Sequence, residues 1–327
     1  MSKHTVSDLR QRQSLPLKAK IIMTKERIRQ WYDYWDGDVY LSFSGGKDST
    51  VLRDLISKTS GVYDVPSVFC DTGLEYPELR KFATERADVV IRPEKRFDEV
   101  IKTYGYPVVS KEVARTIHYA RKGSNWALMR LQGLDPQGNP SVWKERYKKW
   151  EFLKDAPFAV SDQCCDVMKK APFRKYEKAT GRKKYVGTLA AESQLRQSQW
   201  CKVGCNSFEG GKARSAPLSF WTEQDILQYI KENNLPIASV YGEVVPEDGQ
   251  MVLDIDGAVS PKLKTTGCDR TGCMFCMFGC HLEKEPNRFQ RMKETHPRQY
   301  DYCMRPIEEK GLGLGEVLDY LEISKEW

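Results

Sequence analysis

The chain has 327 residues, ten cysteines and a formal net charge of +7. A chain of this length can bury a full hydrophobic core, and we expect one α/β domain with an appended module rather than two equal domains. No apolar run is long enough to cross a bilayer, and the polar start at residues 1–12 lacks the apolar core of a signal peptide, so we expect a cytoplasmic protein. Its cysteines are then expected to be thiols or metal ligands rather than disulfides.

The first predicted element is a helix over residues 17–35. Its apolar residues Ile21, Ile28, Trp31 and Trp35 recur at helical spacing. A stripe of this kind is typical of a helix that packs on a core. We therefore expect residues 1–36 to form an N-terminal helical segment before the first strand.

The apolar run 39–43 predicts a strand, and a glycine-containing polar loop follows it directly. Gly45 and Gly46 allow positive φ angles and let backbone N–H groups approach an anion. A helix predicted over 48–55 adds the attraction of its N-terminal dipole. A plain polar turn is the alternative, but the strand–loop–helix context favours a phosphate-binding loop. Its expected nucleotide-binding residues are Ser42, Ser44, Gly45, Gly46, Lys47, Asp48, Ser49 and Thr50.

This loop does not match the Walker A pattern. Walker A requires Ser or Thr directly after Gly-Lys, and Asp48 stands there instead. It also requires a glycine five residues before the glycine of that pair, and this position is Leu41. A different kind of phosphate loop is therefore implied.

A second loop follows the strand predicted over 67–70. In an open α/β sheet, ligands bind beyond the carboxyl ends of the strands, so we expect this loop and the phosphate loop to face one crevice. A further strand predicted at 185–188 would end at the same crevice. The additional binding residues expected here are Asp71, Thr72, Gly73 and Gly187.

Strand and helix patterns alternate along much of the chain. Further elements are predicted as a helix at 75–87, a strand at 89–92, a helix at 97–104 and a helix at 223–234. This rhythm predicts an α/β fold with a doubly wound parallel sheet. We expect the sheet domain to span 37–235 and a cysteine-rich C-terminal module to span 236–327.

Residues 115–184 form a basic insertion within the predicted domain. They contain 17 Lys and Arg against 7 Asp and Glu, a net charge of +10 in a chain whose total is +7. Aromatic residues, namely Trp126, Trp143, Tyr147 and Trp150, lie between the basic ones. This mixture suits phosphate contacts and base stacking, so a nucleic-acid partner is one interpretation. The favoured alternative is a solvated helical face whose aromatic residues pack on the domain.

Cysteines are concentrated in the C-terminal module, where four fall within thirteen residues. Cys273 and Cys276 form a C-x-x-C pair, which places two sulfurs on one turn where they can share a metal. Zinc and an iron–sulfur cluster both suit four thiolates, so spacing alone does not choose between them. The candidate ligands are Cys268, Cys273, Cys276 and Cys280, together with the tandem pair Cys164 and Cys165.

These motifs resemble those of a known family. The segment Ser44-Gly45-Gly46-Lys47-Asp48-Ser49 is similar to the S-G-G-x-D-S loop of the PP-loop adenine-nucleotide α-hydrolase superfamily. The segment from Asp71 to Glu78 resembles the D-T-G-x-x-x-P-E segment of its phosphoadenylylsulfate (PAPS) reductase family. The resemblance implies a PP-loop, HUP-like fold that binds an adenine nucleotide, with Mg²⁺ where the nucleotide is ATP.

The tandem cysteines extend this resemblance to the iron–sulfur type of the family, because Lys169 and Pro172 follow them in a C-C-x-x-x-K-x-x-P pattern. The type implies a [4Fe–4S] cluster held by Cys164, Cys165, Cys273 and Cys276. The local set Cys268, Cys273, Cys276 and Cys280 is the alternative, as in the related ATP pyrophosphatases of DNA phosphorothioation. Zinc is less favoured than iron, and a chain without any cluster is the remaining alternative.

Two departures from the family pattern bear on the reaction. The family's reductases use a nucleophilic cysteine in a segment like E-C-G-x-H, and no cysteine follows Cys303 in this sequence. The strand exit Gly187-Thr188-Leu189 also lacks the arginine that those reductases tend to carry. We therefore expect an ATP pyrophosphatase that adenylates an acceptor, with Lys47, Asp48 and Asp71 as its catalytic residues.

The resemblance to thiolation systems implies the remaining partners. A nucleic acid or a small nucleotide would be the acceptor, and a cysteine desulfurase would donate the sulfur. A sulfonucleotide reductase that releases sulfite is the first alternative function. A nucleotide-binding subunit without catalytic activity is the second.

Overall fold

The computed structural model describes residues 3–141, 147–209, 213–253 and 259–326. Contacts divide it into two compact units that interleave along the chain. The first unit contains Met1–Asp71, Glu75–Ile91 and Phe173–Thr271, and the second contains Thr72–Leu74, Arg92–Pro172 and Gly272–Trp327. The sequence instead predicts a division into three consecutive segments, with boundaries after residues 36 and 235.

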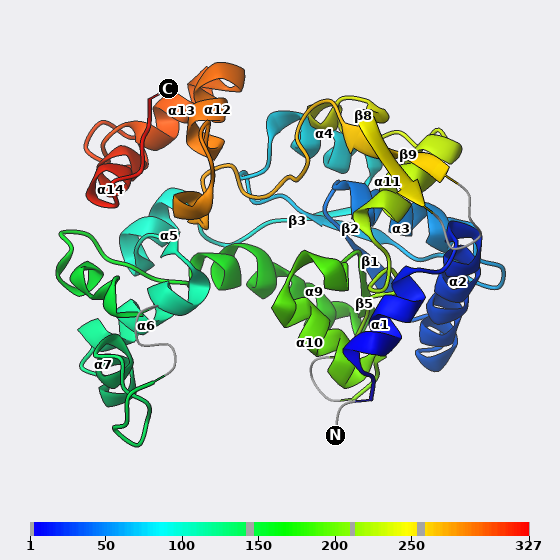
Figure 1. Cartoon of the computed structure of the whole chain (residues 1–327), viewed down its shortest axis with the longest axis horizontal. Coiled ribbons are helices and arrows are strands. Elements are labelled where there is room, and N and C mark those ends of the chain that lie inside the picture. Colours follow the sequence, from blue (N-terminus) through cyan, green and yellow to red (C-terminus); the bar gives the residue numbers. More distant parts are fainter. Residues whose placement is uncertain (1–2, 142–146, 210–212, 254–258, 327) are drawn as a thin grey trace. The chain divides into compact units, whose positions relative to one another are not determined.

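The first unit is built on a six-stranded sheet (Figure 1). Its strands are β1 (Val39–Phe43), β2 (Ser67–Cys70), β3 (Val89–Ile91), β5 (Lys183–Val186), β6 (Asn206–Ser207) and β7 (Arg214–Ser215). Their order is β3-β2-β1-β5-β7-β6; the pair β6–β7 is antiparallel and the other pairs are parallel. Leu41 of β1 pairs with Ser67 on one side and Tyr185 on the other. The chain thus winds outward from β1 in both directions, which confirms the predicted doubly wound parallel sheet apart from the antiparallel edge pair.

Helices accompany this sheet, and one of them carries the predicted apolar stripe. The helices are α1 (Val6–Gln13), α2 (Leu17–Tyr34), α3 (Lys47–Ser57), α4 (Pro77–Arg86), α9 (Ala171–Thr180), which crosses the boundary between the units, α10 (Gln194–Val203) and α11 (Glu223–Glu232). Ile28 and Trp31 of α2 are fully buried, as predicted. Lys20 on the same helix is also buried, because its ammonium pairs with Asp225 of α11 at 2.7 Å. A buried cation requires such a partner.

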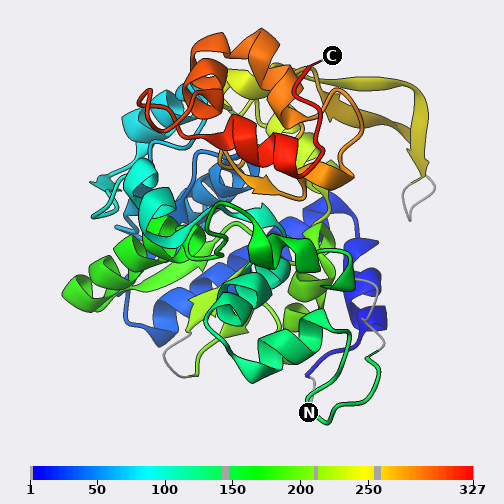
Figure 2. The same ribbon diagram turned by 90° about the vertical axis from the view of Figure 1, so that its left-hand side faces the viewer.

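Two further strands of the first unit form a separate antiparallel pair. These are β8 (Val244–Leu253) and β9 (Val259–Thr265). The first residue of β8, Val244, pairs with the last residue of β9, Thr265. The two strands lie side by side in both views (Figures 1 and 2). The short helices η3 (Ala190–Glu192) and η5 (Ser239–Tyr241) carry residues of the site described below.

The second unit is mainly helical. Its elements are α5 (Phe97–Tyr104), β4 (Val108–Val109), α6 (Lys111–Arg121), α7 (Asn125–Leu131), η1 (Glu151–Asp155), η2 (Asp166–Lys170), β10 (Met277–Phe278), η6 (Cys280–Leu282), α12 (Arg288–Thr295), α13 (Pro297–Met304) and α14 (Leu314–Tyr320). Strands β4 and β10 pair in parallel, with Met277 opposite Val108. Helices α12, α13 and α14 pack in sequence, as the orange-to-red ribbons in Figure 2 show. Within the described ranges, no helix is long and apolar enough to cross a membrane.

Most predicted elements occur close to their expected bounds. The strand predicted at 67–70 is β2, and the helix predicted at 97–104 is α5. The helix predicted at 75–87 begins only at Pro77, which occupies the first turn of α4. Proline is favoured there because an N–H group in the first turn has no partner within the helix.

Candidate functional site

The phosphate loop connects β1 to α3 in the first unit. Gly45 has φ +74°, and a Cβ atom at this position would lie only 2.8 Å from the Cβ of Ala83. The hydroxyl oxygens of Ser44 and Ser49 are 3.0 Å apart across the loop. Helix α3 begins at Lys47 without a side-chain cap. Its first N–H groups are therefore placed to bind an anion, and the local dipole favours one.

A cavity of about 330 Å³ opens beside this loop and lies entirely within the first unit. Gly187, at the exit of β5, forms part of its wall, and a Cβ there would lie 2.9 Å from the backbone nitrogen of Ser49. A glycine thus lets the exit of β5 approach the first turn of α3. The described lining residues are Ser44, Gly46, Lys47, Asp48, Ser49, Gly187, Thr188, Leu189, Glu192, Arg196, Glu223, Tyr241, Asp269, Arg270 and Thr271.

The cations of this phosphate cavity are paired with carboxylates. The buried Lys47 donates a hydrogen bond to Glu223 over 3.1 Å, and its ammonium lies 5.4 Å from the ring centre of Tyr241. Glu192 forms ion pairs with Arg196 and, at 3.7 Å, with Arg270. An incoming phosphate therefore competes with carboxylate oxygens for these cations.

Asp48 faces the same cavity and has a perturbed acidity. Burial raises the pKa of its carboxyl group to about 6, although nearby Lys47 and Arg270 act in the opposite direction. The carboxylate of Glu223 adds to the increase. A buried acid with such a pKa is stabilised in its charged form by an additional cation, such as the metal ion that accompanies a nucleotide.

The predicted nucleotide-binding residues divide into those that line the cavity and those that do not. Ser44, Gly46, Lys47, Asp48, Ser49 and Gly187 line it. Ser42, Gly45, Thr50 and Asp71 are not among its described lining residues. Asp71 instead accepts two hydrogen bonds from Arg80, of 2.7 and 2.8 Å. Thr72 and Gly73 belong to the second unit.

Several lining residues are not marked by the sequence patterns. Arg270 lies two residues after Cys268, in a segment that its cysteines mark only as a metal-binding stretch. Glu223 is the first residue of α11, and no local motif marks it. These residues approach the phosphate loop through the tertiary fold, which one-dimensional spacing does not encode.

A second site lies within the second unit, where two pairs of cysteines line one small cavity. Cys164 and Cys165 lie at the start of the turn that leads into η2, and their sulfur atoms are 3.9 Å apart. In the C-x-x-C pair, the N–H of Cys276 donates to the carbonyl of Cys273 over 3.1 Å. The cavity has a volume of about 20 Å³, and its lining is Leu74, Phe97, Pro107, Cys164, Cys165, Met168, Lys169, Cys273 and Cys276.

The acidities of these cysteines differ. A hydrogen bond from Cys164, together with the ammonium groups of Lys111 and Lys169, lowers the pKa of Cys165. The same hydrogen bond and burial raise the pKa of Cys164. Burial also raises the pKa of Cys276. The ammonium groups of Lys111 and Lys169 thus help to stabilise a thiolate on Cys165.

The donor set suits a group that binds four thiolates, but the site is compact. A volume of about 20 Å³ holds little more than one water molecule, so a cluster would occupy the site only with the thiols moved apart. Among the residues described by the structure, no three His, Cys, Asp or Glu side chains form a preassembled site for a metal ion. The four cysteines are therefore linked by their thiol chemistry and by the cavity that they line together, and not by a preformed coordination geometry.

The other cysteines occupy different surroundings. Cys280 is buried outside this lining, and burial raises its pKa to about 11. Cys268 belongs to the first unit. Cys303 is fully buried, donates to the carbonyl of Tyr300 over 3.3 Å, and has a pKa raised by burial to about 12. Cys70 is a buried residue of β2.

Aromatic residues of the basic insertion mostly pack against other residues of the second unit. The ring of Trp150 lies 5.0 Å from that of His281. Arg130 lies over the rings of both Trp126 and Tyr147, at 5.4 and 5.1 Å. Trp143, Lys144 and Arg146 lie outside the described residues. This packing is the arrangement expected if the insertion is a solvated helical face whose aromatic residues pack on the domain.

Comparisons with known proteins point to one family. A profile described as "Phosphoadenosine phosphosulfate reductase domain" matches residues 38–122 and 109–278. An adenosine 5'-phosphosulfate reductase of Oceanobacillus iheyensis is 25% identical over 225 residues, which are 68% of this chain and 74% of that protein. A sulfate adenylyltransferase subunit 2 of Shewanella frigidimarina is 25% identical over 256 residues, which cover 71% of this chain and 74% of that protein.

One solved structure is also similar. It is the crystal structure of a phosphoadenylyl-sulfate reductase from Candida auris in complex with phosphate. The match has a TM-score of 0.37 and 17% sequence identity, and it covers 66% of this chain and 82% of that chain.

Proposed function

Because this chain belongs to the phosphoadenosine phosphosulfate reductase domain family, whose profile covers more than half of it, we propose that it transfers an adenylyl group from ATP and releases pyrophosphate. The predicted family is confirmed by this match. The prediction of an enzyme is confirmed as well, because the relatives are named as a reductase and an adenylyltransferase. These relatives support a nucleotide-binding role in sulfur metabolism.

The observation that carries the proposal is the charge arrangement in the phosphate cavity. Three cationic side chains, Lys47, Arg196 and Arg270, line it and suit a polyphosphate. The carboxyl group of Asp48 lies among them, and carboxylates suit the Mg²⁺ ion that accompanies ATP. A sulfonucleotide that binds without a metal would gain nothing from this acid.

In the proposed reaction, an oxygen of the acceptor attacks the α-phosphorus of ATP. A new O–P bond forms, and the bond between the α-phosphorus and the bridging oxygen breaks. The electron pair of that bond leaves with pyrophosphate, and the acceptor's proton passes to solvent. Lys47 and the first N–H groups of α3 stabilise the charge that develops on the leaving group. Asp48 would hold Mg²⁺, which supplies further charge neutralisation; Asp71, the other predicted catalytic acid, would first have to leave Arg80.

The proposal also names the class of molecule that accepts the adenylyl group. We keep a nucleic acid or a small nucleotide as the acceptor, with sulfur from a cysteine desulfurase. The positive charge of residues 115–184 supports this choice. Among the aromatic residues of this insertion, Trp126 is 40% exposed and remains accessible to a base.

We also propose that Cys164, Cys165, Cys273 and Cys276 hold a [4Fe–4S] cluster. The support is their shared lining of one cavity within the second unit, together with its apolar walls. The ammonium group of Lys169 lies at the same cavity and offsets the negative charge of thiolates. The cluster would supply sulfur or redox chemistry, or it would hold the cysteine-rich C-terminal module together.

A sulfonucleotide reductase is the second candidate, because its relatives match this chain as well as the adenylyltransferases do. In that reaction a thiolate attacks the sulfur of adenylylsulfate, the S–O bond to AMP breaks, and a second thiol later releases sulfite. Cys303 is poorly suited to be the nucleophile, because it is fully buried and its pKa is raised to about 12.

The proposal is tested by measuring pyrophosphate release from MgATP with sulfate, DNA and RNA as candidate acceptors. We expect release that depends on an acceptor and is lost in Lys47→Ala. Tight ATP binding without pyrophosphate release under any of these conditions would instead identify a non-catalytic nucleotide-binding subunit.

A further inference from the structure

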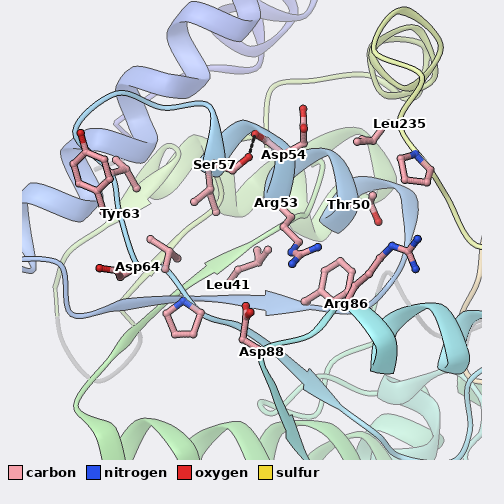
Figure 3. Close-up of a pocket in the computed structure, with 16 residues that line it drawn as sticks. Leu41, Thr50, Arg53, Asp54, Ser57, Tyr63, Asp64, Arg86, Asp88 and Leu235 are labelled. Carbon is pink, nitrogen blue, oxygen red and sulfur yellow. Dashed lines mark hydrogen bonds between the residues drawn. The ribbon is translucent and has the colours of Figure 1, made fainter.

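A larger hollow in the first unit has no part in the proposed reaction (Figure 3). Its volume is about 670 Å³, within the usual range of small-molecule sites. We refer to it as the second hollow. The lining residues that matter here are Thr50, Arg53, Tyr63, Pro66, Arg86 and Leu235.

Helix α3 contributes to both cavities. Residues Lys47, Asp48 and Ser49 line the phosphate cavity, whereas Thr50 and Arg53 line the second hollow. The two lining sets share no residue. A ligand of the second hollow would therefore use different side chains from those that hold ATP in the proposed function.

Two arginines give the second hollow its chemical character. Arg53 comes from α3 and Arg86 from the end of α4, and Figure 3 shows both side chains among the residues around the hollow. The guanidinium carbon of Arg53 lies 5.8 Å from the ring centre of Phe43, and that of Arg86 lies 4.0 Å from the ring centre of Phe82. Contact with an aromatic ring restrains a guanidinium group and leaves its N–H groups able to bind an anion.

Three carboxylates line the second hollow, those of Asp54, Asp64 and Asp88, and two of them have polar partners of their own. Asp54 accepts a hydrogen bond of 2.6 Å from Tyr229 and forms an ion pair with Lys58 at 2.8 Å. Asp88 accepts from both the hydroxyl and the N–H of Ser67, at 2.6 and 2.8 Å. Neither of these two acids lies at ion-pair distance from an arginine of the hollow, although the charge of Arg53 acts on Asp88.

The two arginines consequently keep most of their capacity to bind anions. Within the described ranges, no carboxylate lies at ion-pair distance from Arg53, and Arg86 has only its neighbour Glu85, at 3.7 Å. This differs from the phosphate cavity, where Lys47 is already paired with Glu223. The second hollow therefore needs no carboxylate to be displaced before Arg53 can bind an anion.

Apolar and aromatic groups complete the lining. Tyr63 is 68% exposed, and Pro66 and Leu235 stand around the same space. Such surfaces pack against a flat organic body, while arginine forks match the oxygens of a phosphate or sulfate group. We infer that the second hollow binds a small organic anion of mononucleotide size, with its phosphate or sulfate on Arg53 and Arg86 and its body against Tyr63.

Titration calorimetry with the full chain tests this inference in a Lys47→Ala background, which removes the main cation of the phosphate cavity. The probes are AMP, inorganic phosphate and sulfate. We expect AMP to bind with one site per chain and to bind more tightly than either inorganic anion. Adding Arg53→Ala or Arg86→Ala should weaken AMP binding at least tenfold. Lys81→Ala, on α4 but outside the lining, is the matched control and should leave AMP binding unchanged.

A variant that keeps the positive charge separates the effect of charge from the effect of the guanidinium geometry. Arg53→Lys retains the charge but loses the planar fork, so AMP affinity should fall between that of the Lys47→Ala background and that of the Arg53→Ala variant. Circular dichroism checks that each variant is folded. Equal AMP affinity with and without the two arginines would overturn the inference, and so would the absence of AMP binding to the Lys47→Ala protein. Neither result bears on pyrophosphate release by the unmodified protein.

Discussion

The ammonium group of Lys47 and the carboxylate of Glu223 are joined by a hydrogen bond of 3.1 Å inside the phosphate cavity. The Lys47 side chain is only 6% exposed, whereas that of Glu223 is 44% exposed. The lysine is thus held in place by its surroundings, while the glutamate has room to move. A phosphate oxygen that reaches Lys47 competes with Glu223 for the same proton donor.

Glu223→Gln is expected to tighten the binding of ATP without Mg²⁺ by several-fold. A neutral amide competes less strongly for the ammonium and does not repel phosphate. Calorimetric titration of both proteins measures the change. Glu232→Gln, at the other end of α11, is the matched control. Weaker binding in Glu223→Gln would show that the glutamate helps to hold the ligand instead.

The raised pKa of Asp48 predicts a pH-dependent stability. Its pKa of about 6 in the folded chain exceeds the ordinary 3.8, so the folded state binds this proton more tightly than the unfolded state does. Asp48 therefore favours folding below about pH 4, and this contribution is lost as the pH rises through 6. Asp48→Asn should raise the free energy of unfolding by about 1–2 kcal/mol at pH 8 and change it little at pH 3.5. Denaturant titrations at the two pH values give the comparison, and an equal effect at both would contradict the cause assigned here.

Gly187→Ala tests the close approach of β5 to the phosphate loop. The new Cβ would lie 2.9 Å from the backbone nitrogen of Ser49, so the first turn of α3 must shift. We expect the free energy of unfolding to fall by about 1–3 kcal/mol and ATP affinity to fall at least tenfold. Gly272→Ala is the control, because a Cβ at that position would meet no described atom within 4 Å. Unchanged ATP affinity in Gly187→Ala would mean that this contact does not position the loop.

Serine variants separate the two proposed sets of cluster ligands. After anaerobic purification, Cys165→Ser and Cys276→Ser should each lose most of the bound iron and sulfide, because a serine oxygen is a poor substitute for a thiolate. Cys268→Ser should retain both. Iron and sulfide analysis with the cluster absorption band provides the measurement. Loss in Cys268→Ser together with retention in Cys165→Ser would select the local set of four cysteines.

The sequence was sufficient for the parts of the fold that depend on neighbouring residues. The strand at 39–43 and the glycines that follow it predicted a phosphate loop, and Gly187 was placed beside it by the rule that strand ends share one edge. These inferences need only periodicity and chain connectivity, and the helix bounds followed from the same patterns.

Residues that approach the site from distant segments were not predictable in this way. Glu223 and Arg270 lie about 180 and 220 residues after the phosphate loop, and only the tertiary fold places them at Lys47 and Asp48. Asp71 shows the same limit: its place at a strand end predicted a catalytic role, but the sequence did not reveal its pairing with Arg80. Long-range ion pairs of this kind have no local signature.

Adenylyl transfer is followed most directly with a label on the α-phosphate of ATP. The full chain, purified anaerobically, is incubated with the labelled ATP, Mg²⁺ and the best acceptor, and in parallel with adenylylsulfate and a thiol reductant. We expect the label to appear in an adenylated acceptor or AMP, pyrophosphate to form in equal amount, and no sulfite to be released in the parallel sample. Sulfite release from adenylylsulfate, with no pyrophosphate from ATP, would contradict this expectation.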